Sequence, residues 1–160
     1  MDLRTRLENA FWLTCDELLI QHTNPWELDE ALKIFGFGVG PCEVMDHAGL
    51  IGIHARGQAH ASSILLRMVT EGRIGKIGGV GFYRYPGGGG AVIDPLIEDL
   101  ILEEAWFAKV ARAPMTDAQL VEFVLTKLKT ALQGMDPGSA RTILIERLHF
   151  PAEKLALLEV

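Results

Sequence analysis

The sequence of 160 residues predicts an all-α fold, a helical bundle without a sheet. Two observations predict it. Apolar residues recur three and four positions apart along most of the chain, and they almost never alternate with polar residues as they would in a strand. Recognisable helix starts are also followed at helical lengths by glycine or proline, which end helices. We expect about eight helical segments, with bounds good to a few residues.

The first predicted helix is amphipathic and covers residues 3–21. The second has an unusually complete start signal. Asn24 can cap it, Pro25 suits its first position, and Glu27 follows three residues after the cap. Gly36 is expected to end this helix, because glycine readily adopts the conformation of a helix stop.

The middle of the chain predicts two shorter helices. Pro41 opens the first and Gly49 closes it, whereas residues 50–57 fit either helix or loop. Ser62 or Ser63 can cap the second, which covers residues 64–71.

Glycine-rich segments follow. Residues 72–85 end in Phe82, Tyr83 and Tyr85, and we expect them to form an ordered turn segment because three exposed aromatic rings would be costly. Residues 86–90 read as a linker. Three more helix starts lie beyond it, at Asp94-Pro95, at the capping box of Thr116 and Gln119, and at Asp136-Pro137. The predicted ranges are 94–111, 117–132 and 137–148, followed by a short terminal piece from Pro151.

Composition excludes several classes of function. The net charge of −6 and the pI of about 5.3 argue against a nucleic-acid partner, which needs a surplus of Lys and Arg. No apolar run approaches the roughly 20 residues of a membrane span, and the charged start does not resemble a signal peptide. Cys15 and Cys42 lack metal-binding spacing. We therefore expect a cytoplasmic protein with free cysteines, no membrane and no nucleic acid.

Two glycine clusters and the histidines do not predict a cofactor or metal site. Gly36, Gly38 and Gly40 begin like a dinucleotide fingerprint, but Pro41 holds the place of its third glycine and a helix precedes the cluster. Residues 72–76 are too short for a phosphate loop. His47, His54 and His60 lack the spacing of three or four that a helical metal pair needs. From chemistry alone the sequence predicts a domain with neither cofactor nor metal.

Three stretches carry a resemblance to a known family. Residues 35–50 resemble the glycine-proline signature at the core of the C-terminal domain of 3-hydroxyacyl-CoA dehydrogenases, and residues 72–85 are similar to the segment that closes that domain. Residues 24–32 resemble one of its helix starts. The resemblance covers Met1 to about Tyr85. It implies a helical bundle of the type found at the C-terminus of 3-hydroxyacyl-CoA and 6-phosphogluconate dehydrogenases.

Residues beyond 90 match more weakly. Around Asp94-Pro95 and residues 115–121 they look like the joint into a second copy of the domain, as in multifunctional fatty-acid oxidation proteins. The resemblance thus implies a first domain over residues 1–90 and a degenerate, partial second repeat over residues 91–160 that packs on the first.

The resemblance implies that two domains with different roles act together in β-oxidation. A Rossmann domain, absent from this chain, binds NAD and supplies the His–Glu base and a substrate-binding Ser. The helical domain closes the acyl-CoA site, contributes one asparagine and forms a dimer. In this chain the asparagine position is taken by Thr5, so we expect no catalytic residue and no turnover by the chain alone. Substrate contacts are expected at Thr5, Val39 and Pro41. Structural roles within the motifs are expected at Gly40, Pro41, Glu43, Asp46, Gly49, Gly81, Phe82 and Tyr83.

Departures from the family leave a second hypothesis open. The lysines of the closing segment align with Ile77 and Val80, and Cys42 replaces a phenylalanine. The chain is therefore either an acyl-CoA-site and dimerisation domain or a non-catalytic descendant that acts as a protein-interaction module. Its expected partners are a second copy or a dinucleotide-binding domain. We expect the chain to self-associate, most simply as a dimer, because the helices of residues 3–21 and 40–49 are expected to leave apolar surface exposed. The alternative is that residues 94–160 fold back over this surface and give a monomer.

Overall fold

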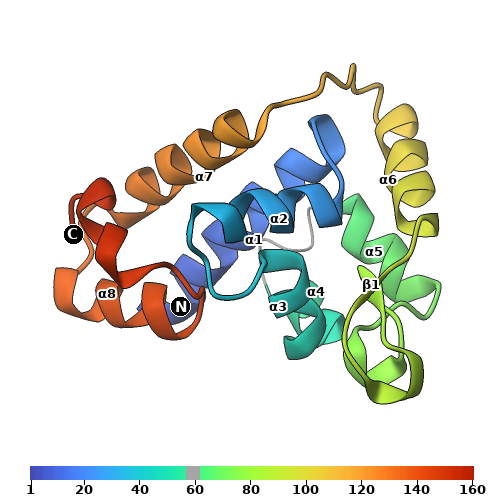
Figure 1. Ribbon diagram of the computed structural model, residues 1–160, viewed down its shortest axis with the longest axis horizontal. Helices are drawn as coiled ribbons and strands as arrows, with labels where there is room; N and C mark the ends of the chain where they lie inside the picture. The colour runs from blue at the N-terminus through green and yellow to red at the C-terminus, as the bar shows by residue number, and fades with distance from the viewer. Residues whose placement is uncertain (57–61) are drawn as a thin grey trace.

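The computed structural model describes residues 1–56 and 62–160, and within these ranges it has eight α-helices, short 3-10 turns and one pair of two-residue strands (Figure 1). The predicted all-α fold is confirmed. The α-helices are α1 (Leu3–Gln21), α2 (Pro25–Phe35), α3 (Pro41–Ala48), α4 (Leu50–Ala55), α5 (Ser63–Thr70), α6 (Leu96–Phe107), α7 (Asp117–Leu132) and α8 (Pro137–Glu146). The 3-10 turns are η2 (Lys76–Gly78), η3 (Pro86–Gly88) and η4 (Ala152–Leu158).

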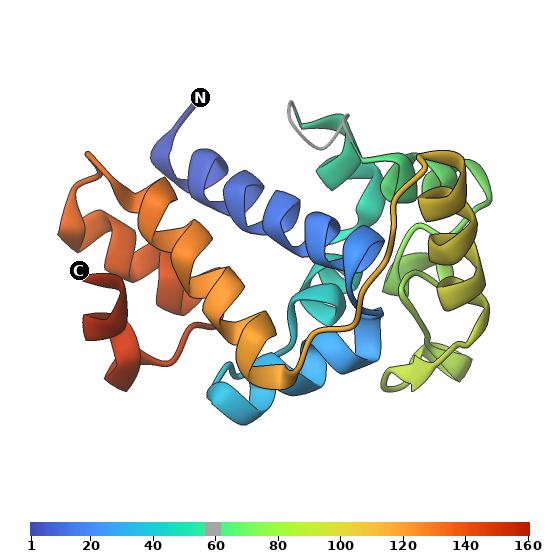
Figure 2. The same ribbon diagram turned by 90° about the horizontal axis from the view of Figure 1, so that it is seen from above.

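Helix α1 forms the centre of the bundle. It packs against α6, α7 and α8 and also touches α2 and α3, and Figure 2 shows α7 running alongside it. Its apolar residues Leu7, Phe11, Cys15 and Leu18 are fully buried. The expectation that α1 exposes an apolar face is therefore wrong, because the helices after residue 94 fold back over that face.

The capping residues of α2, α7 and α8 act as the sequence predicts, whereas α6 begins at Leu96, after Pro95, without a side-chain cap. Asn24 accepts a hydrogen bond from the Glu27 amide at the start of α2, and Thr116 and Gln119 form a reciprocal capping box on α7. Of the two candidate serines, Ser62 caps α5. Residues 50–55, for which the sequence left helix and loop open, form the short helix α4, whereas His60 lies outside the described residues.

The expectation of no sheet and a linker at residues 86–90 needs correction. Strands β1 (Tyr83–Arg84) and β2 (Val92–Ile93) pair antiparallel, with Tyr83 opposite Ile93. The glycines between them form a turn in which Gly87 and Gly88 adopt positive φ angles of 63° and 73°. A run of glycines therefore closes a small hairpin here, because it supplies the backbone conformations that a tight reversal requires.

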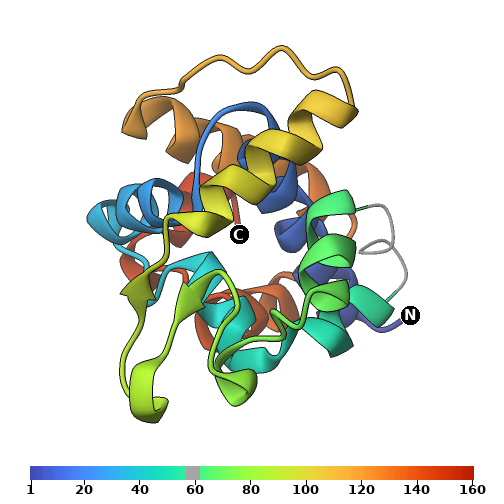
Figure 3. The ribbon, with the colours of Figure 1, turned by 90° about the vertical axis from the view of Figure 1, so that its right-hand side faces the viewer.

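Two helices end earlier than predicted. Helix α6 stops at Phe107, short of residue 111, because Lys109 takes a left-handed conformation (φ 57°). Residues 108–116 then cross the end of the bundle to α7, which Figure 3 shows. Helix α8 likewise ends at Glu146, two residues before the expected position.

Candidate functional site

The corner between α2 and α3 is built around the buried carboxylate of Asp29. Its Oδ1 accepts a hydrogen bond from the backbone N–H of Cys42 (2.9 Å), and its Oδ2 accepts one from the N–H of Glu43 (3.1 Å) and one from the Tyr83 hydroxyl (2.8 Å). Cys42 and Glu43 lie in the first turn of α3, where backbone N–H groups are unpaired and the helix dipole favours negative charge. Asp29 therefore joins α2 to α3 and to β1.

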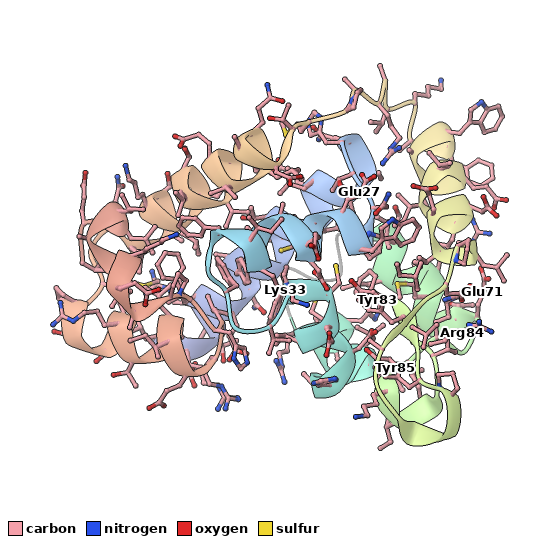
Figure 4. All side chains as sticks on the ribbon, in the orientation of Figure 1. Glu27, Lys33, Glu71, Tyr83, Arg84 and Tyr85 are labelled. Carbon is pink, nitrogen blue, oxygen red and sulfur yellow. The ribbon has the colours of Figure 1, made fainter. Side chains whose placement is uncertain are left out.

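A second buried carboxylate, Asp46, joins α3 to the turn before β1. Its Oδ1 accepts a hydrogen bond from the N–H of Phe82 (2.8 Å). Its Oδ2 accepts one from the N–H of Tyr83 (3.0 Å) and one from the Tyr85 hydroxyl (2.7 Å). Figure 4 shows Tyr83, in β1, and Tyr85, directly after this strand. We call Asp29, Asp46, Tyr83 and Tyr85 the carboxylate clasp.

Two motif glycines are needed because each lies against one of these carboxylates. A Cβ at Gly40 would lie 2.7 Å from Oδ2 of Asp29, and one at Gly81 would lie 2.7 Å from Cγ of Asp46. Both distances are well inside van der Waals contact, so any side chain would displace the carboxylate. The glycines of the two motifs thus allow the backbone to approach the clasp.

Burial dominates the electrostatics of the clasp. It raises the pKa of Asp29 to about 7 and that of Asp46 to about 6, although the hydrogen bonds each carboxylate accepts lower its pKa. Burial and the neighbouring carboxylates also raise the pKa of both tyrosine hydroxyls. These groups are at most 7 % exposed and they face one another. The clasp can therefore fix the corner but cannot offer an acid or base to a substrate.

The motif residues with expected structural roles occupy this region. Gly40 precedes α3, Pro41 is its first residue and Gly49 ends it with a φ of 97°. The side chain of Glu43 also lies 3.5 Å from His47 on the same helix. Phe82 is buried beside the clasp at 1 % exposure.

The three expected substrate contacts are spread over two elements. Thr5 lies half-buried in the first turn of α1, where its N–H donates to the capping Asp2 (2.7 Å). Val39 is half-buried in the loop before α3, and Pro41 is buried behind it. That loop is held by a hydrogen bond from the N–H of Gly38 to the carbonyl of His149 (3.1 Å). No hydrogen bond within residues 1–56 and 62–160 joins Thr5 to Val39 or Pro41.

Sequence reasoning gave Asp29 no role, and of Tyr85 it predicted only that the residue lies in an ordered segment with Phe82 and Tyr83. The signal for Asp29 was available, because an acidic residue beside Leu28 and Leu32 lies within the apolar face of its helix. Tyr85 gave no such signal, since nothing local to it indicates Asp46 as its partner, 39 positions away.

The described part of the chain has neither a group of metal-ligating side chains nor a membrane-spanning helix. No group of three or more His, Cys, Asp or Glu residues there is placed to hold a metal ion. None of the described helices has both the length and the apolar character needed to cross a bilayer.

Two of the comparisons with known proteins give a match, one to a family and one to a fold. The family described as "3-hydroxyacyl-CoA dehydrogenase, C-terminal domain" matches residues 4–85. No curated protein matches the sequence. Among solved structures, the dehydrogenase part of multifunctional enzyme 1 from C. elegans is similar, with a TM-score of 0.69 and 19 % identity. The similarity covers 91 % of this chain and 36 % of that one, so the chain spans about a third of the length of this relative.

Proposed function

The chain belongs to the family of 3-hydroxyacyl-CoA dehydrogenase C-terminal domains, and we propose that it is the helical domain that closes the acyl-CoA site of such an enzyme in fatty-acid β-oxidation. In this proposal NAD and the base that accepts the proton come from a dinucleotide-binding domain outside these 160 residues. The observation that carries the proposal is the family match over residues 4–85, which spans α1 to the hairpin.

The carboxylate clasp supports this role physically. It fixes the start of α3 against α2 and β1, so the half-buried Val39 is held in a loop with little freedom, while the buried Pro41 supports it from within. A substrate-binding loop gains affinity when its conformation is set before binding. Thr5, with a hydroxyl in place of the family's amide, would contribute a shorter and weaker contact from the first turn of α1.

The experiment combines the chain with a dinucleotide-binding domain taken from a relative of the family. The chain alone should neither bind NADH saturably nor oxidise 3-hydroxyacyl-CoA, because the described residues hold no strand–glycine loop–helix unit. The mixture should form NADH from 3-hydroxyacyl-CoA, and Thr5→Asn should raise that rate. Micromolar NADH binding by the chain alone, or an inactive mixture in which the two proteins demonstrably associate, would contradict the proposal.

A second candidate function is a non-catalytic interaction module. Trp106 and Phe107 at the end of α6 favour it, since they are 76 % and 64 % exposed and their ring centroids lie 5.5 Å apart. Exposed apolar side chains that lie together in this way mark interfaces. If the chain is an interaction module, replacing Trp106 and Phe107 by serine should abolish partner binding. If the chain is the helical domain of a dehydrogenase, the same change should leave NADH formation by the two-domain mixture intact.

We also propose that the chain self-associates, but through a surface other than the apolar face of α1. Because α7 and α8 cover α1, a homodimer would have to use surface such as that of α6. Sedimentation velocity over a range of concentrations decides between this dimer and a monomer. A single monomeric species up to high micromolar concentration would exclude the dimer.

We also propose that residues 91–160 are a partial second copy of the domain. In the first half, helices α1 and α2 are followed by a loop that carries Phe37, and in the second half α7 and α8 are followed by a loop that carries Phe150. These two loops are in contact. Phe37 and Phe150 pack edge to face with ring centroids 5.3 Å apart, next to the hydrogen bond between Gly38 and His149. A truncation after residue 90 should therefore expose the apolar face of α1 and cause association or precipitation.

We place the protein in the cytoplasm, which fits its two buried, free cysteines.

A further inference from the structure

A surface groove of about 580 Å³ lies between the N-terminal half of α2, strand β2 and the segment that leads into α7. Figure 3 shows these three elements along one side of the molecule. Four apolar and three acidic side chains line the groove. Its volume is in the range of ligand-binding sites, so the chemistry of its lining residues decides what it can hold.

The apolar side chains of the groove come from segments that are far apart in the sequence. Trp26 and Met115 are half-buried and pack against the core. Ile93 is 49 % exposed, and Pro114 is exposed as well. Apolar side chains gathered in a concave part of the surface are typical of an interaction site, because covering them removes apolar area from water.

All the charged side chains that line the groove are acidic. They are Glu27, Glu30 and Asp117, all exposed, and none of them forms an ion pair with another residue of the described part of the chain. Glu27 and Asp117 lie in the first turns of α2 and α7, where the helix dipole favours a negative charge. Glu30 lies in the second turn of α2, so the dipole does not explain it. Three like charges around one groove repel one another and attract a cationic partner.

The combination of apolar and acidic residues selects the class of partner. The carboxylates repel nucleic acid and an anionic membrane surface. A purely apolar segment would desolvate the carboxylates without giving them a partner, which costs free energy. A polypeptide segment with Lys or Arg beside an apolar side chain meets both requirements, because its charges pair with the carboxylates while its apolar group covers Trp26 and Met115.

We propose that this groove docks a basic, apolar segment of another protein. An apolar side chain of that segment contacts Trp26 and Met115, and its flanking Lys or Arg residues pair with the three carboxylates. An arginine there can also stack on the Trp26 ring. The proposal does not rest on the acyl-CoA function, because Thr5, Val39 and Pro41 do not line the groove.

The test titrates the full chain, labelled with ¹⁵N, with three synthetic peptides blocked at both ends. The probe is Gly-Arg-Leu-Phe-Arg-Gly. The first control peptide has glutamate in place of both arginines, and the second has serine in place of leucine and phenylalanine. The chain has three tryptophans, and Trp26→Phe identifies the indole N–H signal of Trp26. We expect the probe to shift this signal saturably, whereas the signal of Trp106, which is exposed outside the groove, stays in place.

The control peptides separate the two parts of the recognition. The glutamate peptide should bind at least about tenfold more weakly, because it brings like charges together. The serine peptide should bind about fivefold more weakly, because it covers less apolar area. Spermidine is a cation without an apolar side chain and should not displace the probe at equal concentration. Equal affinity of the probe and either control peptide would overturn the proposal, and so would displacement of the probe by spermidine.

Two variants with the same net charge locate the site. Glu30→Lys should weaken binding of the probe about five- to tenfold. Glu153→Lys, an exposed change on η4 outside the groove, should leave the affinity unchanged. Equal weakening by both variants would mean that the probe responds only to the net charge of −6, which contradicts docking in the groove. The peptide comparison on the wild type decides the question if a variant fails to fold. A dinucleotide-binding domain that displaces the probe on joining the chain would also overturn the proposal, because the groove would then be a contact between the two domains.

Discussion

The backbone at Gly81 lies directly against the carboxylate of Asp46, so that a Cβ on residue 81 would lie 2.7 Å from Cγ of Asp46 and 2.8 Å from Cα of Gly75. This contact is what allows the N–H groups of Phe82 and Tyr83 to reach that carboxylate. The closing glycine motif and the opening helix motif therefore form one structural unit, although they are about 35 residues apart in the chain.

Gly81→Ala should destabilise the fold. The added methyl group must push either a buried carboxylate or the backbone of Gly75, and overpacking of this kind costs about 1–3 kcal/mol. Urea denaturation followed by circular dichroism measures the free energy of unfolding. Gly90→Ala is the matched control, because a Cβ there meets nothing within 4 Å, and it should change stability by less than about 0.5 kcal/mol. Equal stability of the two variants would contradict the tight contact.

Tyr85→Phe should lower the free energy of unfolding by about 1.5–3 kcal/mol, the usual value for a hydrogen bond to a charged group. The change removes the hydroxyl that donates to Oδ2 of Asp46 (2.7 Å) and leaves the ring in place. Thr142→Val removes an exposed hydroxyl on α8 and serves as the control. A loss no larger than that of the control would show that the Tyr85 hydroxyl does not support the clasp.

Stability should fall as the pH rises from about 4 to about 7. Burial raises the folded-state pKa of Asp29 to about 7, and those of Asp46 and Asp16 to about 6. Over this range the unfolded chain, whose aspartates titrate near 3.9, has already lost protons that the folded chain keeps. Folding therefore loses free energy as the pH increases, by about 1.4 kcal/mol for each unit of pKa difference.

The measurement is a series of urea denaturations between pH 4 and pH 8. Asp46→Asn removes one titrating group and should make the decline shallower between pH 4 and pH 6, whereas Asp99→Asn, on the exposed side of α6, should leave the slope unchanged. A free energy of unfolding that instead increases over this range would show that the hydrogen bonds to the clasp outweigh its burial.

The sequence predicts much of the helical framework because the signals are local. The cap of Asn24 on α2, the capping box of Thr116 and the stop at Gly49 each depend on residues within a few positions of one another. Such contacts form within a single helix end, so their spacing alone reveals them. The range of α1, Leu3–Gln21, was predicted correctly for the same reason.

The clasp and the hairpin could not be predicted from local pattern. Asp29 accepts a hydrogen bond from Tyr83, which lies 54 residues away in the sequence, and Asp46 accepts one from Tyr85, 39 residues away. No periodic pattern in the sequence predicts these pairs. The family resemblance marked Asp46 and Tyr83 as motif residues but gave no partner for either. The glycines of residues 87–90 led to the wrong prediction of a linker, because a flexible linker and a tight turn can have the same composition.

Arg112→Lys should loosen the segment that crosses from α6 to α7. The Arg112 guanidinium donates to the carbonyls of Ile20 (3.2 Å), Leu19 (3.1 Å) and Thr23 (2.5 Å), at the end of α1 where carbonyls lack partners within the helix. Its planar fork reaches several acceptors at once, and a single ammonium group cannot. The loss should be about 1–3 kcal/mol of unfolding free energy, as for a buried hydrogen bond broken on one side.

A local measurement separates this effect from a general loss of stability. Lys109 is exposed in the crossing segment, so trypsin cleavage after it reports how freely residues 108–116 move. Cleavage there should be several times faster in Arg112→Lys than in the wild type at a temperature where both remain folded. Arg141→Lys, an exposed change on α8, should alter neither the stability nor the cleavage rate. If cleavage after Lys109 is equally fast in all three proteins, Arg112 does not anchor the segment, and some other contact, such as the hydrogen bond from the Ala113 N–H to the carbonyl of Gln21 (3.1 Å), holds it in place.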